Sequence, residues 1–230
     1  ARYALSYVPP EGTSLADLGR LWLGRDIYSG EMQDQPFVSG LAPERIVELT
    51  KWRRLEGFHS VLKPSFQLSA GTTIEGMIST ARILANNLEP VEIPQLEINV
   101  IGKFIVLAPT VPSPRIAELA AQSVRVLDGY RQPIEMDLNS RFLRDKLTLY
   151  QIRMLKHWGY PYVMEEFQFF LPMTDRIEDD KEREILGKAL SKLCKPVIGD
   201  PFSINALTII GQENRSQPMR LIETIPFGLQ

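Results

Sequence analysis

The residues of this sequence that could do acid–base chemistry are few, because it contains only two histidines, His59 and His157. The first lies in EGFHSVLKPSF, residues 56–66, where side chains alternate as in a β-strand. His59, Val61 and Lys63 are therefore expected to share one face. A histidine and a lysine two residues apart can both reach one anion, and binding should strengthen below about pH 6.5, the ordinary pKa of histidine. The alternative for Lys63 is a solvated or ion-paired side chain.

The other candidate groups favour structural roles. His157 precedes Trp158-Gly159 at the expected end of a helix, where a cation or donor to the last carbonyls is the common role, rather than a relocated catalytic one. Cys194 is the only cysteine, which excludes an internal disulfide and a thiolate metal cluster, and packing is favoured over catalysis. The phosphate-loop pattern Gly-x-x-x-x-Gly-Lys is absent from the sequence.

Composition predicts a soluble globular protein. The 230 residues are 44% hydrophobic and 23% charged, with a formal net charge of -2 and a pI near 5.8. Nucleic acid is therefore an unexpected partner, although a local basic cleft could override the average. No apolar run reaches the roughly 18 residues of a spanning helix, and ARYALSYVPP does not resemble a signal peptide. We expect a cytoplasmic protein without a membrane, metal or cofactor requirement.

Two predicted strands must position the chemistry. The first is FHSVLKPSFQL, in which Phe58, Ser60 and Leu62 face away from His59. The second lies in EEFQFFLPMT, residues 165–174. One of its faces is wholly apolar, with Phe167, Phe169, Leu171 and Met173, and the other is mixed, with Gln168, Phe170, Pro172 and Thr174. The apolar faces should pack on helices, and the mixed faces should border the space between the two expected lobes.

The order of elements predicts an α+β fold. Residues 57–109 read as strand, helix and hairpin, and residues 165–226 repeat that order, with hairpin turns near Gly102-Lys103 and across NRSQP. We expect two similar lobes, each an antiparallel sheet backed by helices, around a central cleft within one bilobal domain, 1–230. The alternative is a chance recurrence, since many α+β domains contain such runs.

GFHSVLKPSF at 57–66 resembles the first signature of the two-histidine (2H) phosphoesterase superfamily, whose His-x-Thr/Ser-x motif occurs once per lobe. The chain is more closely similar to a family of unknown function encoded in phosphonate-metabolism operons. That likeness includes WGYPYVMEEFQFFLPMT at 158–174, the opening RYALSYVPPEGTSLADLGRLWLGRD and the late segment DPFSINALTIIGQ. The likeness covers nearly the whole chain. The 17-residue match is specific evidence for the family, whereas the four-residue motif alone would be weak evidence.

The resemblance implies metal-independent chemistry on phosphate esters. Each lobe would give one histidine, of which one acts as general base and the other as general acid, while the two motif hydroxyls hold phosphate oxygens. Substrates across the superfamily include cyclic phosphates and the 2′,5′-linked or 3′-terminal phosphates of RNA. For this family, the operon context implies a small phosphorylated or phosphonate compound.

This sequence departs from the family pattern at three of four motif positions. His59 is present, but Val61 and Pro172 stand where hydroxyls are expected, and Phe170 stands at the second histidine position. None of these side chains donates a hydrogen bond or transfers a proton. Thr174 lies on the correct face but about 6–7 Å further along an extended strand. We expect His59 and Phe170 to face each other across one cleft.

The leading hypothesis is a catalytically degenerate 2H phosphoesterase-like protein that retains at most a cleft for a phosphorylated or phosphonate ligand. Lys63 and Thr174 could contact the ligand, and Tyr160 and Tyr162 could line the cleft mouth or simply pack. The competing hypothesis is an active cyclic phosphodiesterase or phosphoesterase that uses His59 with a non-standard partner. The sequence identifies no protein partner.

Overall fold

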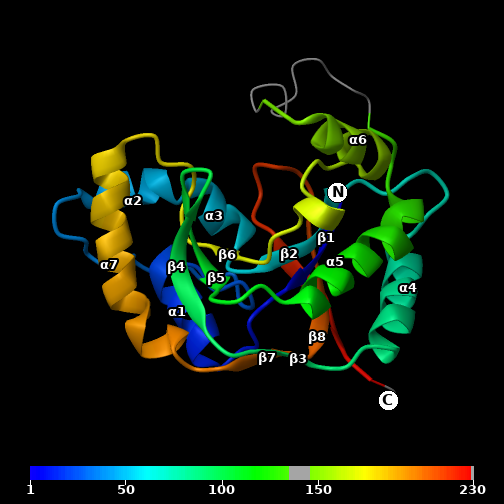
Figure 1. The fold of residues 1–230 in the computed structure, drawn as a ribbon, viewed down its shortest axis with the longest axis horizontal. Helices are drawn as coiled ribbons and strands as arrows, with labels where there is room; N and C mark the ends of the chain where they lie inside the picture. Colours follow the sequence, from blue (N-terminus) through cyan, green and yellow to red (C-terminus); the bar gives the residue numbers. More distant parts are fainter. Residues whose placement is uncertain (135–145, 229–230) are drawn as a thin grey trace.

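The computed structural model describes residues 1–134 and 146–228, and the fold is α+β as expected (Figure 1). Antiparallel sheets lie in the middle, and α4, α5 and α7 lie towards the outside. The helices are α1 (Ser14–Leu23), α2 (Pro43–Leu49), α3 (Lys51–Glu56), α4 (Ile74–Asn86), α5 (Pro114–Leu127), α6 (Leu149–Trp158) and α7 (Asp180–Ile198), with short 3-10 helices η1 (Asp128–Tyr130) and η3 (Met164–Glu166).

The described strands form three antiparallel sheets. A four-stranded sheet has the order β2-β1-β8-β9, a three-stranded sheet the order β4-β5-β6, and β3 pairs with β7 in a two-stranded ribbon. The strands are β1 (Arg2–Tyr7), β2 (Ser60–Phe66), β3 (Val91–Ile93), β4 (Leu96–Ile101), β5 (Phe104–Pro109), β6 (Leu171–Pro172), β7 (Phe202–Ile204), β8 (Ala206–Gln212) and β9 (Arg220–Pro226).

The repeated order of elements is real, but each sheet combines strands from both repeats. The first motif strand, β2, shares its sheet with β8 and β9 from the second repeat. The second motif strand, β6, pairs with β5 of the hairpin from the first repeat. The expectation that residues 57–109 and 165–226 each build their own lobe is therefore wrong, because the two hairpins are exchanged.

Helices back both sheets. In the four-stranded sheet, α4 packs on β8 and β9 while α5 packs on β2, and α7 packs on β4 of the three-stranded sheet and on α1. The expected hairpin turn at Gly102-Lys103 is confirmed, with φ of 53° and 72°. Positive φ at both central residues is the geometry that joins two twisted strands with a two-residue loop.

APERIVELTKWRRL at 42–55, with Pro43 near its start, and SRFLRDKLTLYQIRMLKHWG at 140–159, with Gly159 at its end, each have the sequence pattern of one helix, and the structure differs from both patterns. The helix expected over residues 42–55 is interrupted at Thr50, and α3 starts afresh there. The helix expected over residues 140–159 is described only from residue 146, and residues 140–145 lie outside the described part. In that part α6 begins at Leu149, because Thr148 and Gln151 form a capping box.

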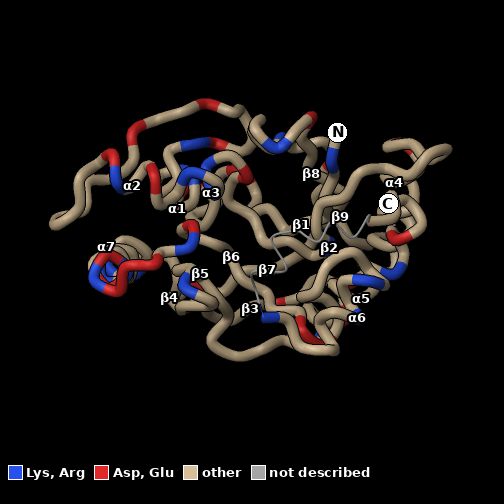
Figure 2. The backbone as a smooth tube through the Cα atoms, turned by 90° about the horizontal axis from the view of Figure 1, so that it is seen from above, with Lys and Arg blue, Asp and Glu red and all other residues tan. Residues whose placement is uncertain are grey.

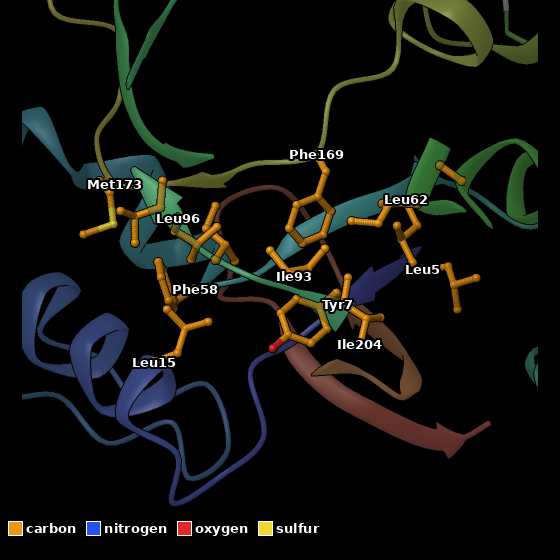
Figure 3. Packing of buried hydrophobic residues seen from close by; sticks show 14 of the residues in the cluster. Leu5, Tyr7, Leu15, Phe58, Leu62, Ile93, Leu96, Phe169, Met173 and Ile204 are labelled. Atoms are coloured by element: carbon orange, nitrogen blue, oxygen red, sulfur yellow. The ribbon is translucent and has the colours of Figure 1, made fainter. Parts of the chain in front are cut away.

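One hydrophobic core includes residues of the four-stranded sheet and of the three-stranded sheet (Figure 3). Phe169 points towards Tyr7 with ring centroids 6.0 Å apart, and Leu62 lies beside it. Tyr7 also stacks on Phe202 of the two-stranded ribbon at 5.6 Å. The aromatic residue that enters the core from the second motif is thus Phe169, which agrees with the apolar face expected for that segment.

Helix α7 carries both acidic and basic residues (Figure 2), with Asp180 and Glu182 in its first turn and Lys195 in its last. Lys188 pairs with Glu184 at 2.6 Å on the exposed side of this helix. Within residues 1–134 and 146–228, no helix is long and apolar enough to cross a bilayer. The same residues contain no group of three or more His, Cys, Asp or Glu placed to hold a metal ion.

Candidate functional site

His59 lies immediately before β2 and is buried, with 4% of its surface exposed. Burial lowers its pKa to about 3, and the positive charges of Arg53 and Arg25 lower it further, against a backbone hydrogen bond with Glu56. The imidazole is therefore neutral at physiological pH. Among the described residues, its Nδ1 atom has no hydrogen-bond partner. A pKa of about 3 places protonation of His59 in the ligand-free chain well below pH 6.5, and the expected strengthening of phosphate binding below pH 6.5 stays a prediction.

A β-bulge in β2 separates Lys63 from His59 and Val61. Ser6 of β1 pairs with Val61, but the next residue of β1, Leu5, pairs with Lys63, so that Leu62 is an extra residue. Residues paired across an antiparallel ladder point to the same side of the sheet. Val61 therefore shares a face with Ser6, and Lys63 shares the opposite face with Leu5. The expectation that His59, Val61 and Lys63 share a face is wrong at Lys63.

Lys63 occupies an interior position on the helix side of the sheet. Its Nζ atom donates to the Val124 carbonyl near the end of α5 and lies 3.4 Å from Asp128 Oδ1. The ammonium also lies 5.1 Å from the centre of the Phe66 ring. Burial lowers the pKa of Lys63 to about 8, although Asp128 acts in the opposite direction. The ion-paired alternative describes this residue, and its contact with a ligand stays a prediction.

The second motif is less regular than expected. In place of one strand over 165–174, the structure has the 3-10 helix η3 followed by an extended segment, of which only Leu171–Pro172 is a strand. Pro172 has no amide hydrogen, so it cannot donate to the ladder, and regular pairing ends there. The alternation of side chains nevertheless holds, since Phe169, Leu171 and Met173 are buried in the core.

The mixed face of the second motif contains the departed motif positions. Gln168 is exposed, whereas Phe170 and Pro172 are half-buried and lie outside the hydrophobic core. Thr174 is buried, and its hydroxyl accepts a hydrogen bond from the backbone amide of Ile105 at 3.0 Å. Thr174 thus has a structural partner. That His59 and Phe170 face each other stays a prediction.

Asp175 links the two motif segments, a role that the sequence did not reveal. Its carboxylate accepts hydrogen bonds from the backbone amides of Trp52 and Arg53, and its own amide donates to the Leu49 carbonyl. This cap explains why α3 restarts after Thr50. The Arg53 guanidinium, which influences His59, also pairs with Asp175 at 3.2 Å. The end of the second motif therefore lies against the helix that precedes the first.

Arg25 joins its own segment to two others by hydrogen bonds, and its charge acts on His59. Its guanidinium donates to the carbonyls of Arg54 and Leu55 at the end of α3, and to the carbonyl of Met219 before β9. Arg25 is 4% exposed, and burial lowers its pKa. A buried guanidinium with several carbonyl partners rigidifies its surroundings. Neither its importance nor its partners could be seen in the sequence, because the three segments are far apart along the chain.

The remaining candidates lie near α6. Tyr160 and Tyr162 contact each other edge to face with ring centroids 5.7 Å apart, and Tyr162 is 36% exposed. His157 lies in the last turn of α6, as expected, with its ring against Trp158, and its backbone carbonyl accepts a hydrogen bond from Arg131. A ligand-lining role for the two tyrosines stays a prediction.

Comparisons with known proteins agree with the family expected from the motifs. A family model described as "Protein of unknown function (DUF1045)" matches residues 61–220. The chain is 29% identical to the ribose 1,5-bisphosphate phosphokinase PhnN of Janthinobacterium sp. (strain Marseille), over 100% of this chain and 51% of that protein. It is 26% identical to the protein of the same name from Laribacter hongkongensis (strain HLHK9), over 77% of this chain and 41% of that protein. The chain thus spans about half the length of these curated relatives.

Similar solved structures include E. coli LigT complexed with 3′-AMP, with 7% identity, a TM-score of 0.42 and coverage of 99% of this chain and 98% of that chain. Kluyveromyces marxianus Usb1 shows 9% identity and a TM-score of 0.39, with coverage of 98% and 96%. The expected relation to a family of unknown function is confirmed by the match over residues 61–220. The chain therefore belongs to the family DUF1045.

Proposed function

We propose that this chain is a 2H phosphoesterase-like protein that has lost phosphodiesterase turnover and binds a small phosphorylated or phosphonate ligand near His59. The observation that supports this most directly is the chemistry of the departed positions. Val61, Phe170 and Pro172 supply neither the second proton-transfer group nor the hydroxyls that the family pattern requires. The positive charges of Arg25 and Arg53 also act on His59, although Arg53 is paired with Asp175 and Glu56, and a positive charge near the imidazole supports an anionic ligand.

The names of the curated relatives narrow the ligand class. Both are called ribose 1,5-bisphosphate phosphokinase. The present sequence has no Gly-x-x-x-x-Gly-Lys pattern, so the kinase reaction itself is not part of the proposal. We propose a sugar phosphate as the ligand class, with ribose 5-phosphate as the first compound to test. We also propose that the protein is cytoplasmic, and we assign it no protein partner.

The loss of turnover is testable with ribosyl cyclic phosphates and cyclic nucleotides. The parent should show no hydrolysis above background, because a missing general acid or base typically costs 10²–10⁴-fold. A missing hydrogen-bond donor to the transition state costs about 10²–10³-fold. Phe170→His alone should recover little, since groups that act as a unit are not additive. The triple change Val61→Thr, Phe170→His and Pro172→Thr should regain activity first.

One observation favours the competing hypothesis of an active phosphodiesterase. A general base must be unprotonated, and the low pKa of His59 keeps its imidazole neutral across the physiological range. Parent turnover that is abolished by His59→Ala would establish this alternative and refute the degenerate assignment. Turnover that survives His59→Ala would place the chemistry elsewhere in the chain.

A further inference from the structure

The face of the four-stranded sheet that carries Val61 also carries a buried hydroxyl that the motif does not include. Ser6 in β1 is the direct ladder partner of Val61 in β2, and on its other side it pairs with Thr208 in β8. Cβ atoms of directly opposed residues lie about 4.5–5.5 Å apart. Ser6 therefore presents its hydroxyl one strand away from the position where the family pattern has a hydroxyl.

The orientation of Ser6 follows from its neighbours along β1. Leu5 and Tyr7 belong to the main hydrophobic core, in which Tyr7 packs on Phe169. Ala4 and Val8 belong to a separate small cluster with Ile27 and Met219. Since side chains alternate, Ser6 points to the same side as Ala4 and Val8, which is the side of Val61. His59, two residues before Val61, extends the same row.

Two polar atoms in this row are buried without a partner among the described residues, Ser6 Oγ and His59 Nδ1. Ser6 is 0% exposed and His59 is 4% exposed. A buried polar group without a hydrogen bond costs free energy, and strain, a catalytic role or a bound water or ion are the explanations for such a group in a native protein. The Ser6 hydroxyl can donate to a phosphoryl oxygen, whereas the unpartnered Nδ1 of a neutral imidazole accepts and suits a hydroxyl of the ligand.

We propose that Ser6 donates the hydrogen bond to a phosphoryl oxygen of the ligand beside His59 and so replaces the hydroxyl that Val61 lacks. This inference rests on the proposed function and identifies a binding residue that the family motif does not contain. The Ser6 hydroxyl is on β1, whereas the family pattern has its hydroxyl at the Val61 position of β2, on the same face of the sheet. Because Ile27 and Met219 belong to the cluster on that face, binding requires these side chains to move, while Arg25 continues to hold the Met219 carbonyl.

The two histidines make a direct test possible. Protein labelled with ¹⁵N-histidine gives ring signals from His59 and His157 alone, and His157→Gln assigns them. Inorganic phosphate and ribose 5-phosphate are titrated separately into the parent. We expect the His59 ring signals to shift with a saturable dependence on ribose 5-phosphate, while the His157 signals stay unchanged.

Ser6→Ala should weaken this binding about tenfold or more, because a hydrogen bond to a charged oxygen is lost. The matched control is Ser123→Ala, another fully buried serine, whose hydroxyl donates to the Leu119 carbonyl in α5. It should change the affinity less than twofold. Adding Val61→Thr to Ser6→Ala returns a hydroxyl to the same face and should restore most of the affinity.

The outcomes separate this inference from the proposed function. Saturable binding to the parent that is unchanged in Ser6→Ala would overturn the role of Ser6 and leave the ligand cleft standing. Binding that is lost in Ser6→Ala but not restored by Val61→Thr would overturn the replacement of one hydroxyl by the other. A parent in which neither compound shifts the His59 signals would overturn both proposals.

Discussion

The buried state of His59 should make the stability of this protein depend on pH in a predictable window. Its pKa is about 3 in the folded chain, against the ordinary value of 6.5. Between these values the unfolded chain binds a proton that the folded chain does not. The contribution of His59 to stability is therefore fully present above about pH 6.5 and is lost as the pH falls towards 3.

The magnitude follows from the two pKa values. One pKa unit corresponds to 1.36 kcal/mol, so the full shift would cost about 5 kcal/mol below pH 3. At pH 5 the histidine of the unfolded chain is almost fully protonated and that of the folded chain almost fully neutral. The expected loss of unfolding free energy between pH 8 and pH 5 is then about 2 kcal/mol from this one group.

Urea denaturation of the parent, His59→Gln and His157→Gln at pH 8 and pH 5 measures this difference. Carboxylates also titrate at low pH, but they contribute equally to all three proteins and cancel in the comparison. The parent and His157→Gln should lose about 2 kcal/mol more than His59→Gln. Equal losses in all three proteins would show that His59 is solvated or already protonated in the folded chain, and would refute the argument from burial.

Three further predictions concern buried groups. Burial lowers the pKa of Lys63 to about 8, so between pH 8 and pH 10.5 the unfolded chain holds a proton that the folded chain has lost. The parent should therefore gain up to about 3 kcal/mol of unfolding free energy across this range, and urea denaturation of Lys63→Met should show no such gain. Ser6→Ala should leave the unfolding free energy unchanged or raise it, whereas Ser123→Ala should lower it by about 1 kcal/mol; a large loss in Ser6→Ala would reveal a structural partner. Burial raises the pKa of Cys194 to about 12, so the native protein should resist a thiol reagent that labels the urea-unfolded chain at once, and rapid native labelling would contradict this burial.

Much of the fold could be predicted from the sequence because local signals determine it. Thr13 and Gly24 bound α1 as the capping pattern indicates, and the positive φ values of Gly102 and Lys103 close the expected hairpin. The pairing of strands could not be predicted, since hydrophobic alternation gives the faces of a strand but not its neighbours. The exchange of hairpins between the two sheets is a property of the whole chain.

The candidate site was predictable only in part, and for a similar reason. The motif located His59 and the departed positions Val61, Phe170 and Pro172. Alternation failed at Lys63, because one extra residue in β2 reverses the side to which it points. The pairing of Ser6 with Val61 and the contacts of Arg25 and Asp175 were missed altogether, because they join segments distant in the sequence and no local pattern marks them.

The exchange of hairpins has a consequence for how the chain folds during its synthesis. β1 and β2 can pair as soon as residue 66 has left the ribosome, but the other edge of β1 must await β8, which begins at Ala206. At about 5–20 residues per second, that edge stays unpaired for roughly 7–30 s. Throughout this interval an exposed strand edge rich in apolar residues is available to other chains. We therefore expect the yield of folded protein to depend more on chaperones and translation speed than its final stability would indicate.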